Sequence, residues 1–129
     1  MRTIVTMAAS MLCLSGAAAA AELENFRANS TADVAALCGA DPQSELYAEA
    51  MQFCFGYISG AVQFHHAVVR AGSIRPIACP GAEATREQFA SYFAGWARTT
   101  ATAQELAEPP VEGMARAAAA RWPCEGARG

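Results

Sequence analysis

The sequence predicts an all-α fold: one small helical bundle of four to five helices stapled by two disulfides. Apolar residues recur at steps of three and four along several segments that open with helix-start signals. No segment shows the apolar–polar alternation of a strand bounded by turns. The chain has 129 residues, which leaves room for one domain of roughly 100 residues once an N-terminal signal is removed.

Residues 1–21 have the pattern of a cleaved secretory signal peptide. Arg2 supplies the positive charge, residues 4–14 the apolar run, and alanines 19–21 the small-residue cleavage site. Three hydroxyl residues interrupt the apolar run, which is short for a hydrocarbon layer of ~30 Å, so no stable membrane anchor is expected. We therefore expect cleavage near Ala21 and a soluble periplasmic product.

The mature chain is expected to form a single domain over residues 22–129, with its core at about 30–124. Residues 22–29 carry no clear period and are predicted to be a short exposed lead-in. Without Arg2, eight basic and 12 acidic residues give a formal net charge of −4. This excludes the basic footprint of a nucleic-acid-binding protein.

A short first helix is predicted after Ser30. Ser30 and Asp33 have the spacing of a capping box, and Gly39 is placed to end the helix. Three apolar residues share one of its faces: Val34, Leu37 and Cys38.

A long second helix is predicted from Asp41-Pro42 to about Ala71, with Gly72 ending it. One stripe of this helix is expected to be buried: Tyr47, Ala50, Met51, Cys54, Tyr57, Ile58, Ala61, Phe64, His65 and Val68. Gly56 and Gly60 each cost about 1 kcal/mol relative to alanine in a helix, so another helix is expected to approach them closely.

The rest of the chain is predicted to form a loop and three further helical segments. Residues 73–84 are rich in proline and glycine and form the loop, which Cys79 ties down. Thr85 and Gln88 open a third helix with a capping box. Its core face holds Phe89, Tyr92, Phe93, Trp96 and Ala97. A single turn follows at 103–108, and then Pro109-Pro110 starts a last helix. The apolar positions of that helix are Val111, Met114, Ala115, Ala118 and Trp122.

The cysteines predict structural disulfides. Cys13 leaves with the signal, and the remaining even set in an exported chain is Cys38, Cys54, Cys79 and Cys124. No C-x-x-C is present, and spacings of 16, 25 and 45 fit no zinc finger, so neither a redox pair nor a metal site is expected. Four cysteines allow three pairings, and spacing does not choose among them.

No catalytic, cofactor-binding or metal-binding residue is predicted. The adjacent His65 and His66 project about 100° apart on a helix and cannot chelate a metal as an i,i+4 pair does. Ser59 is one position away from a nucleophile elbow and lies mid-helix. Glu45 and Glu49 are interpreted as carboxylates favoured by the helix dipole. These absences indicate a binding protein rather than an enzyme.

Four motifs in fixed order carry a resemblance to a known family. They are Leu37-Cys38, then Cys54-x-Gly56-Tyr57-Ile58-x-Gly60, then Cys79-Pro80 with Thr85-x-x-Gln88, and finally Trp122-Pro123-Cys124. Over residues 30–124 the chain resembles the Rap/Tai family, the immunity proteins of type VI secretion amidase toxins. Where many relatives have a His-Pro-Glu-like segment, this chain has residues 103–108.

The resemblance implies a small helical periplasmic protein that binds a secreted peptidoglycan amidase and occludes its active site without catalysis. It also implies the pairs Cys38–Cys54 and Cys79–Cys124. Exposed loops on rigid scaffolds commonly carry binding, so the expected contact residues are Ser73, Ile74, Arg75 and Pro76. A homodimer is left open. The alternative function is a periplasmic acid-stress chaperone without a cognate toxin, triggered by protonation of its carboxylates.

Overall fold

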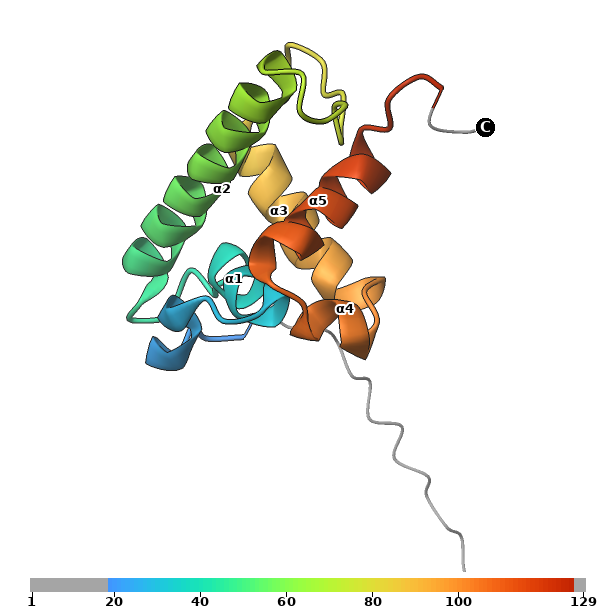
Figure 1. The fold of residues 1–129 in the computed structure, drawn as a ribbon. Helices are drawn as coiled ribbons and strands as arrows, with labels where there is room; N and C mark the ends of the chain where they lie inside the picture. Colours follow the sequence, from blue (N-terminus) through green and yellow to red (C-terminus); the bar gives the residue numbers. More distant parts are fainter. Residues whose placement is uncertain (1–18, 127–129) are drawn as a thin grey trace, which may run out of the picture.

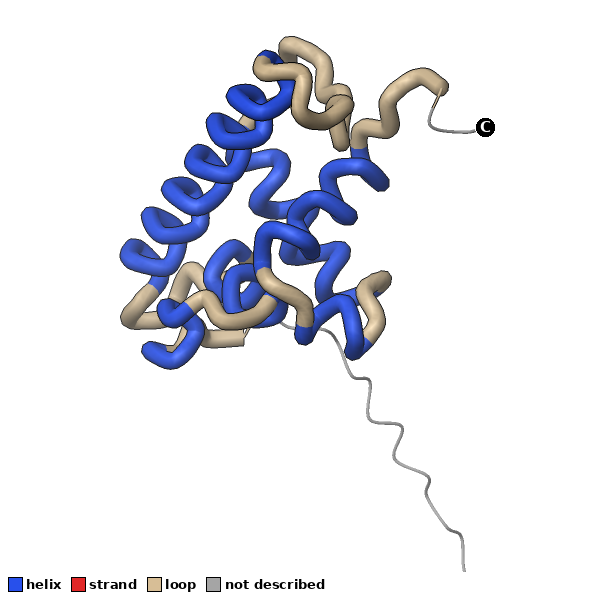
Figure 2. The backbone as a smooth tube through the Cα atoms, in the orientation of Figure 1, coloured by secondary structure: helices blue, strands red, loops and turns tan. Residues whose placement is uncertain are grey.

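The computed structural model describes residues 19–126, and over that range the chain is helical with no strand (Figures 1 and 2). This confirms the predicted all-α class with five α-helices in the described part. A 3-10 helix precedes them, and the order is η1 Leu23–Arg27, α1 Thr31–Cys38, α2 Tyr47–Arg70, α3 Arg86–Thr99, α4 Ala103–Ala107 and α5 Pro110–Arg121. The prediction for residues 1–18 of the signal falls outside the described residues.

Local hydrogen bonds set the predicted starts of α1 and α3. Ser30 Oγ accepts the Asp33 N–H at 3.2 Å, and Asp33 Oδ2 accepts the Ser30 N–H at 3.1 Å. Thr85 and Gln88 make the same reciprocal pair at the start of α3, with both distances 3.1 Å. Each cap of this kind stabilises a helix by about 1 kcal/mol relative to alanine. Both capping boxes are therefore as predicted.

The predicted start of α2 at Asp41-Pro42 is wrong, because α2 begins at Tyr47. Asp41 Oδ1 accepts the Gln43 N–H at 2.9 Å, and the Asp41 carbonyl accepts the Ser44 N–H at 2.9 Å. These bonds form a turn that competes with the helix for the same backbone groups. The predicted end is confirmed, since Gly72 follows α2 with a φ of 72°.

No residue of the lead-in at 22–29 is buried and most are exposed, as predicted, but the segment is helical and packs against the domain. It contains η1, whose Asn25 side chain donates a hydrogen bond to Asp33 Oδ1 at 3.2 Å. Phe26 is half-buried and meets the Phe53 ring edge-on, with centroids 5.7 Å apart. Ala21 is buried in the same small apolar cluster, so packing begins before residue 30.

The core lies around α1, which contacts α2, α3, α4 and α5. Its largest fully buried side chains are Phe93, Leu37, Val34, Thr31 and Cys54. Buried Thr31 is satisfied, because its Oγ1 donates to the Glu108 carbonyl at 3.0 Å. α5 passes so close to α1 that a Cβ on Gly113 would collide with the Thr31 side chain.

The expectation for Gly56 and Gly60 is wrong. A Cβ at either position would meet nothing within 4 Å, and both residues are exposed. They lie on the side of α2 opposite Ala50, Cys54 and Ile58, its three buried residues. The close helix approaches occur instead at Gly113 and at Gly39, where an added Cβ would lie 2.9 Å from the Ala94 Cβ.

The buried stripe predicted for α2 holds only in its first half. Phe64 is 70 % exposed, and no residue of α2 after Ile58 is fully buried. In Figure 1 the second half of α2 rises past the core toward the loop that joins it to α3. No helix within residues 19–126 has both the length and the apolar character to cross a bilayer.

Candidate functional site

Two disulfides connect the elements around the candidate site. Cys38–Cys54 joins the end of α1 to α2 inside the core, and Cys79–Cys124 joins the α2–α3 loop to the segment after α5. These are the pairs that the family resemblance implies. The second disulfide therefore determines where the loop lies relative to the C-terminal segment.

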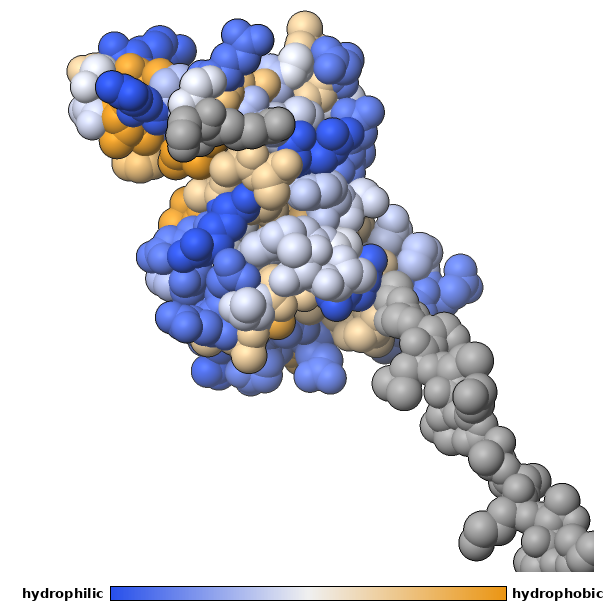
Figure 3. Space-filling view, turned by 90° about the vertical axis from the view of Figure 1, so that its right-hand side faces the viewer, coloured by the Kyte–Doolittle hydropathy of each residue, from blue (hydrophilic) through white to orange (hydrophobic). Residues whose placement is uncertain are grey.

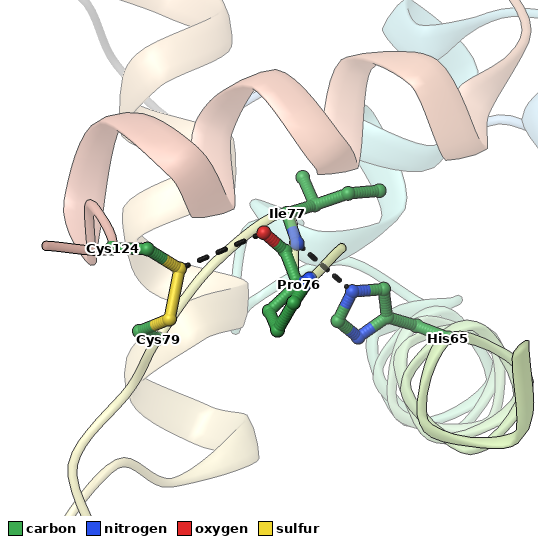
Figure 4. The surroundings of a disulfide bond; sticks show 5 residues. All are labelled: His65, Pro76, Ile77, Cys79 and Cys124. Atoms are coloured by element: carbon green, nitrogen blue, oxygen red, sulfur yellow. Dashed lines mark hydrogen bonds between the residues drawn. A yellow bond between two sulfur atoms is a disulfide. The ribbon is translucent and has the colours of Figure 1, made fainter. Parts of the chain in front are cut away.

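Hydrogen bonds hold the same loop on both sides, and Figure 4 shows the one between Ile77 and His65. The Cys79 N–H donates to the Trp122 carbonyl at 2.8 Å, and the Ile77 N–H donates to His65 Nε2 at 3.1 Å. Cys124 Sγ lies 3.6 Å from the Pro76 carbonyl oxygen, a packing contact because a disulfide sulfur carries no proton. The loop thus bridges α2 and the C-terminal segment. His65 of α2 is the acceptor of one of these bonds.

An apolar groove of about 390 Å³ lies between the second half of α2, the loop and α5. Phe89 of α3, Met114 of α5 and Trp122 are among its lining residues. Three exposed aliphatic side chains lie on its three walls: Val62 of α2, Ile77 of the loop and Val111 of α5. Figure 3 shows hydrophobic surface gathered in a hollow beneath the upper lobe of the molecule. Apolar surface concentrated in one hollow is typical of a binding site.

Arg86 is the arginine that lines the groove, and contacts with three neighbouring side chains hold its guanidinium. Its guanidinium lies 4.8 Å from the centroid of the Phe55 ring, and its Nη1 is 3.4 Å from Ser59 Oγ. Its Nη2 also lies 3.5 Å from Glu87 Oε1, with both side chains about half exposed. Ser59 thus contacts an arginine at the groove, and no histidine base is paired with it in the described residues.

The structure places the predicted contact residues 73–76, here called the loop tip, on the exposed α2–α3 loop directly before Ile77. They do not line the groove, whereas the following residue Ile77 does. Among residues 19–126, no group of three or more His, Cys, Asp or Glu side chains could hold a metal. Glu45 and Glu49 are exposed.

The groove was not predicted from the sequence, although several of its lining residues were named there as apolar positions. Val111 was named among the apolar positions of the last helix, and its side chain is 49 % exposed. Val62 has no place in the predicted stripe of α2. Helical periodicity identifies an apolar face, but not whether another element covers it. The signal available in the sequence was Val62, an apolar residue next to the predicted buried stripe of α2.

Comparison with known protein families gives a match. A family model described as Rap1a immunity proteins matches residues 30–124, which is more than half of the 129 residues. The match includes α1 to α5 and all four cysteines of the disulfides. No curated protein and no solved structure matches the chain.

Proposed function

This chain belongs to the Rap1a immunity protein family, and from that premise we propose that it binds and inhibits a peptidoglycan amidase delivered by type VI secretion. The family match carries the proposal, because immunity proteins act on a toxin through binding. Inhibition is stoichiometric and needs no catalytic group of this chain. The amidase target and the secretion route are the finer parts of the proposal.

The proposed compartment is the periplasm, where such an amidase meets its substrate. Two disulfides support it, because such bonds form and persist in oxidising compartments. The signal-peptide pattern of residues 1–21 supports it independently. We propose that residues 22–129 act there as one domain.

The loop tip at 73–76 is the proposed contact with the toxin. Its residues are exposed, and Ile74 offers an apolar side chain that is 42 % exposed. The disulfide and the two backbone hydrogen bonds hold the loop in place before binding. A preorganised loop loses less conformational entropy on binding, and a projecting loop suits a concave amidase active site.

The test is to immobilise the oxidised mature protein and expose it at neutral pH to the secreted and envelope proteins of its source organism. Retained proteins are identified by mass spectrometry, purified and assayed on peptidoglycan with and without an equimolar amount of this chain. We expect one stoichiometric partner whose amidase activity is inhibited. Retention of nothing at neutral pH, together with retention of many unfolded proteins in acid, would contradict the proposal in favour of a chaperone.

A further inference from the structure

We propose that the groove between α2, the loop and α5 is a second contact site, which takes an apolar segment of the partner protein flanked by carboxylates. The inference rests on the proposed function, since the partner is the toxin. It adds a surface apart from the loop tip and states the chemistry that this surface recognises.

The apolar part of the ligand follows from the walls of the groove. Val62, Ile77 and Val111 belong to three different elements, and each is 44 to 49 % exposed while lining the same hollow. A volume of about 390 Å³ is large enough to enclose side chains rather than merely touch them. Covering this surface would remove apolar area from water, which favours binding.

The preference for carboxylates in the ligand follows from the charge of the groove. The chain has 12 acidic residues, yet none of the residues lining the groove is Asp or Glu. Its polar lining includes Arg86, His65 and His66. Three acids lie close by outside the lining: Glu83 and Glu112 are sequence neighbours of lining residues, and Glu87 pairs with Arg86. This pair, with 3.5 Å between Glu87 Oε1 and Arg86 Nη2, is exposed and contributes little, so a partner carboxylate can replace Glu87.

Residues 50–82, which include the second half of α2 and most of the loop, carry a positive formal charge. No acidic residue occurs between Glu49 and Glu83, whereas Arg70 and Arg75 lie in that stretch. The second half of α2 and the loop are therefore locally positive on a chain whose formal net charge is −3. Opposite charges across an interface favour the encounter and exclude like-charged partners, so the geometry favours carboxylates beside the apolar segment.

The experiment displays a random peptide library on phage and selects it against the immobilised oxidised chain. Enriched peptides are then measured on Val62→Glu and Val111→Glu, which place an acid on the groove walls at exposed positions. Leu23→Glu is the matched control, because Leu23 is 76 % exposed and does not line the groove. Circular dichroism and intact disulfides establish that each variant is folded.

We expect the enriched peptides to combine large apolar residues with adjacent Asp or Glu. Binding should fall at least tenfold in both groove variants, weaken with salt and remain unchanged in Leu23→Glu. Failure to enrich any peptide, enrichment without acidic residues, or equal binding by the groove variants would overturn the proposal. So would a wild-type chain that is dimeric in sedimentation when Val111→Glu is monomeric, because a second copy would then fill the groove.

The same variants separate this inference from the proposed function. Peptide binding without capture of any amidase would remove the toxin as partner and leave the groove as a site. Capture of an amidase with equal affinity by wild type and Val111→Glu, and no peptide binding, would retain immunity and remove the groove.

Discussion

The two disulfides lie in opposite surroundings. Cys38 and Cys54 are 5 % and 0 % exposed and belong to the core cluster with Val34, Ile58 and Phe93. Cys79 lies on an exposed loop, where Ala78 alone among residues 71–83 is even partly buried. The first bond joins helices that already pack together. The second fixes a segment that packing does not hold.

The two disulfides therefore act on different properties: the first on the stability of the domain, and the second on the position of the α2–α3 loop. Segments with few buried apolar contacts open locally without unfolding the domain, so the loop depends on its covalent and hydrogen-bonded anchors for its position. The groove and the loop tip depend on the same anchors. The core disulfide thus stabilises the fold, and the surface disulfide positions the proposed binding region.

The largest expected effect distinguishes the two disulfides by stability. Replacing Cys38 and Cys54 with serine should lower the free energy of unfolding by about 3 to 5 kcal/mol, because two polar groups then replace a packed bond in the core. Replacing Cys79 and Cys124 should lower it by less than half as much, since the freed loop also gains entropy in the folded state. Urea unfolding measures both.

The reverse order would contradict this comparison. The chain-entropy model alone predicts it, because the second disulfide closes 45 residues and the first closes 16. Hydrogen exchange supplies a second readout. In the Cys79/Cys124 variant, protection should be lost at the Ile77 and Cys79 amides and kept in α1.

Alanine substitutions at two helical glycines test how closely α5 and α2 are packed. Gly113→Ala should destabilise the protein by about 1 to 3 kcal/mol, because the new methyl group collides with the buried Thr31 side chain. Gly56→Ala should stabilise it by up to about 1 kcal/mol, because that helical position is open. Thermal unfolding measures the pair, and shifts in the same direction would contradict the packing described.

The loop tip should affect binding without affecting stability. Ile74→Ala and Arg75→Ala are each expected to weaken toxin binding about tenfold, or about 1.4 kcal/mol, with unchanged unfolding. Calorimetry with the purified toxin measures the affinity, and Leu23→Ala is the exposed apolar control. Unchanged affinity in both variants would remove residues 73–76 as the contact.

The smallest expected effect is on the pH dependence of stability, and it comes from Glu105 of α4. The hydrogen bond from the Thr102 N–H, 2.8 Å from Glu105 Oε2, lowers the pKa of the Glu105 carboxyl. A depressed folded-state pKa contributes stability above the unfolded value of about 4.3, and this is lost as the pH falls through the folded value. Glu105→Gln should flatten this part of the stability–pH curve, measured by urea unfolding in acid. An unchanged curve would remove Glu105 as a contributor.

Features that depend on a few neighbouring residues could be predicted from the sequence. The capping boxes at Ser30 and Thr85 and the left-handed Gly72 are set by hydrogen bonds and sterics within one helical turn. The false helix start at Asp41 fails for the same kind of reason. Aspartate followed by proline is compatible with both a helix cap and a turn, and the local pattern does not separate them.

Features that depend on what packs against a helix could not be predicted. Periodicity gave α2 one apolar stripe, but the chain covers only its first half, so Phe64 is exposed and Val62 lines the groove. Glycine in a helix indicates a close approach somewhere, yet Gly56 is open while Gly113 touches Thr31. The groove was not predicted either, because its walls come from α2, the loop and α5.

The sequence by itself determined the helical class, the capping boxes of α1 and α3, the long loop and the four cysteines that staple the fold. These follow from local hydrogen bonding, side-chain period and residue type. The tertiary structure decided which glycines meet a neighbour, which apolar residues stay exposed, and that three walls from distant segments form one groove. Those outcomes depend on the direction in which each helix leaves the core, and that direction is set by packing among residues far apart in the chain.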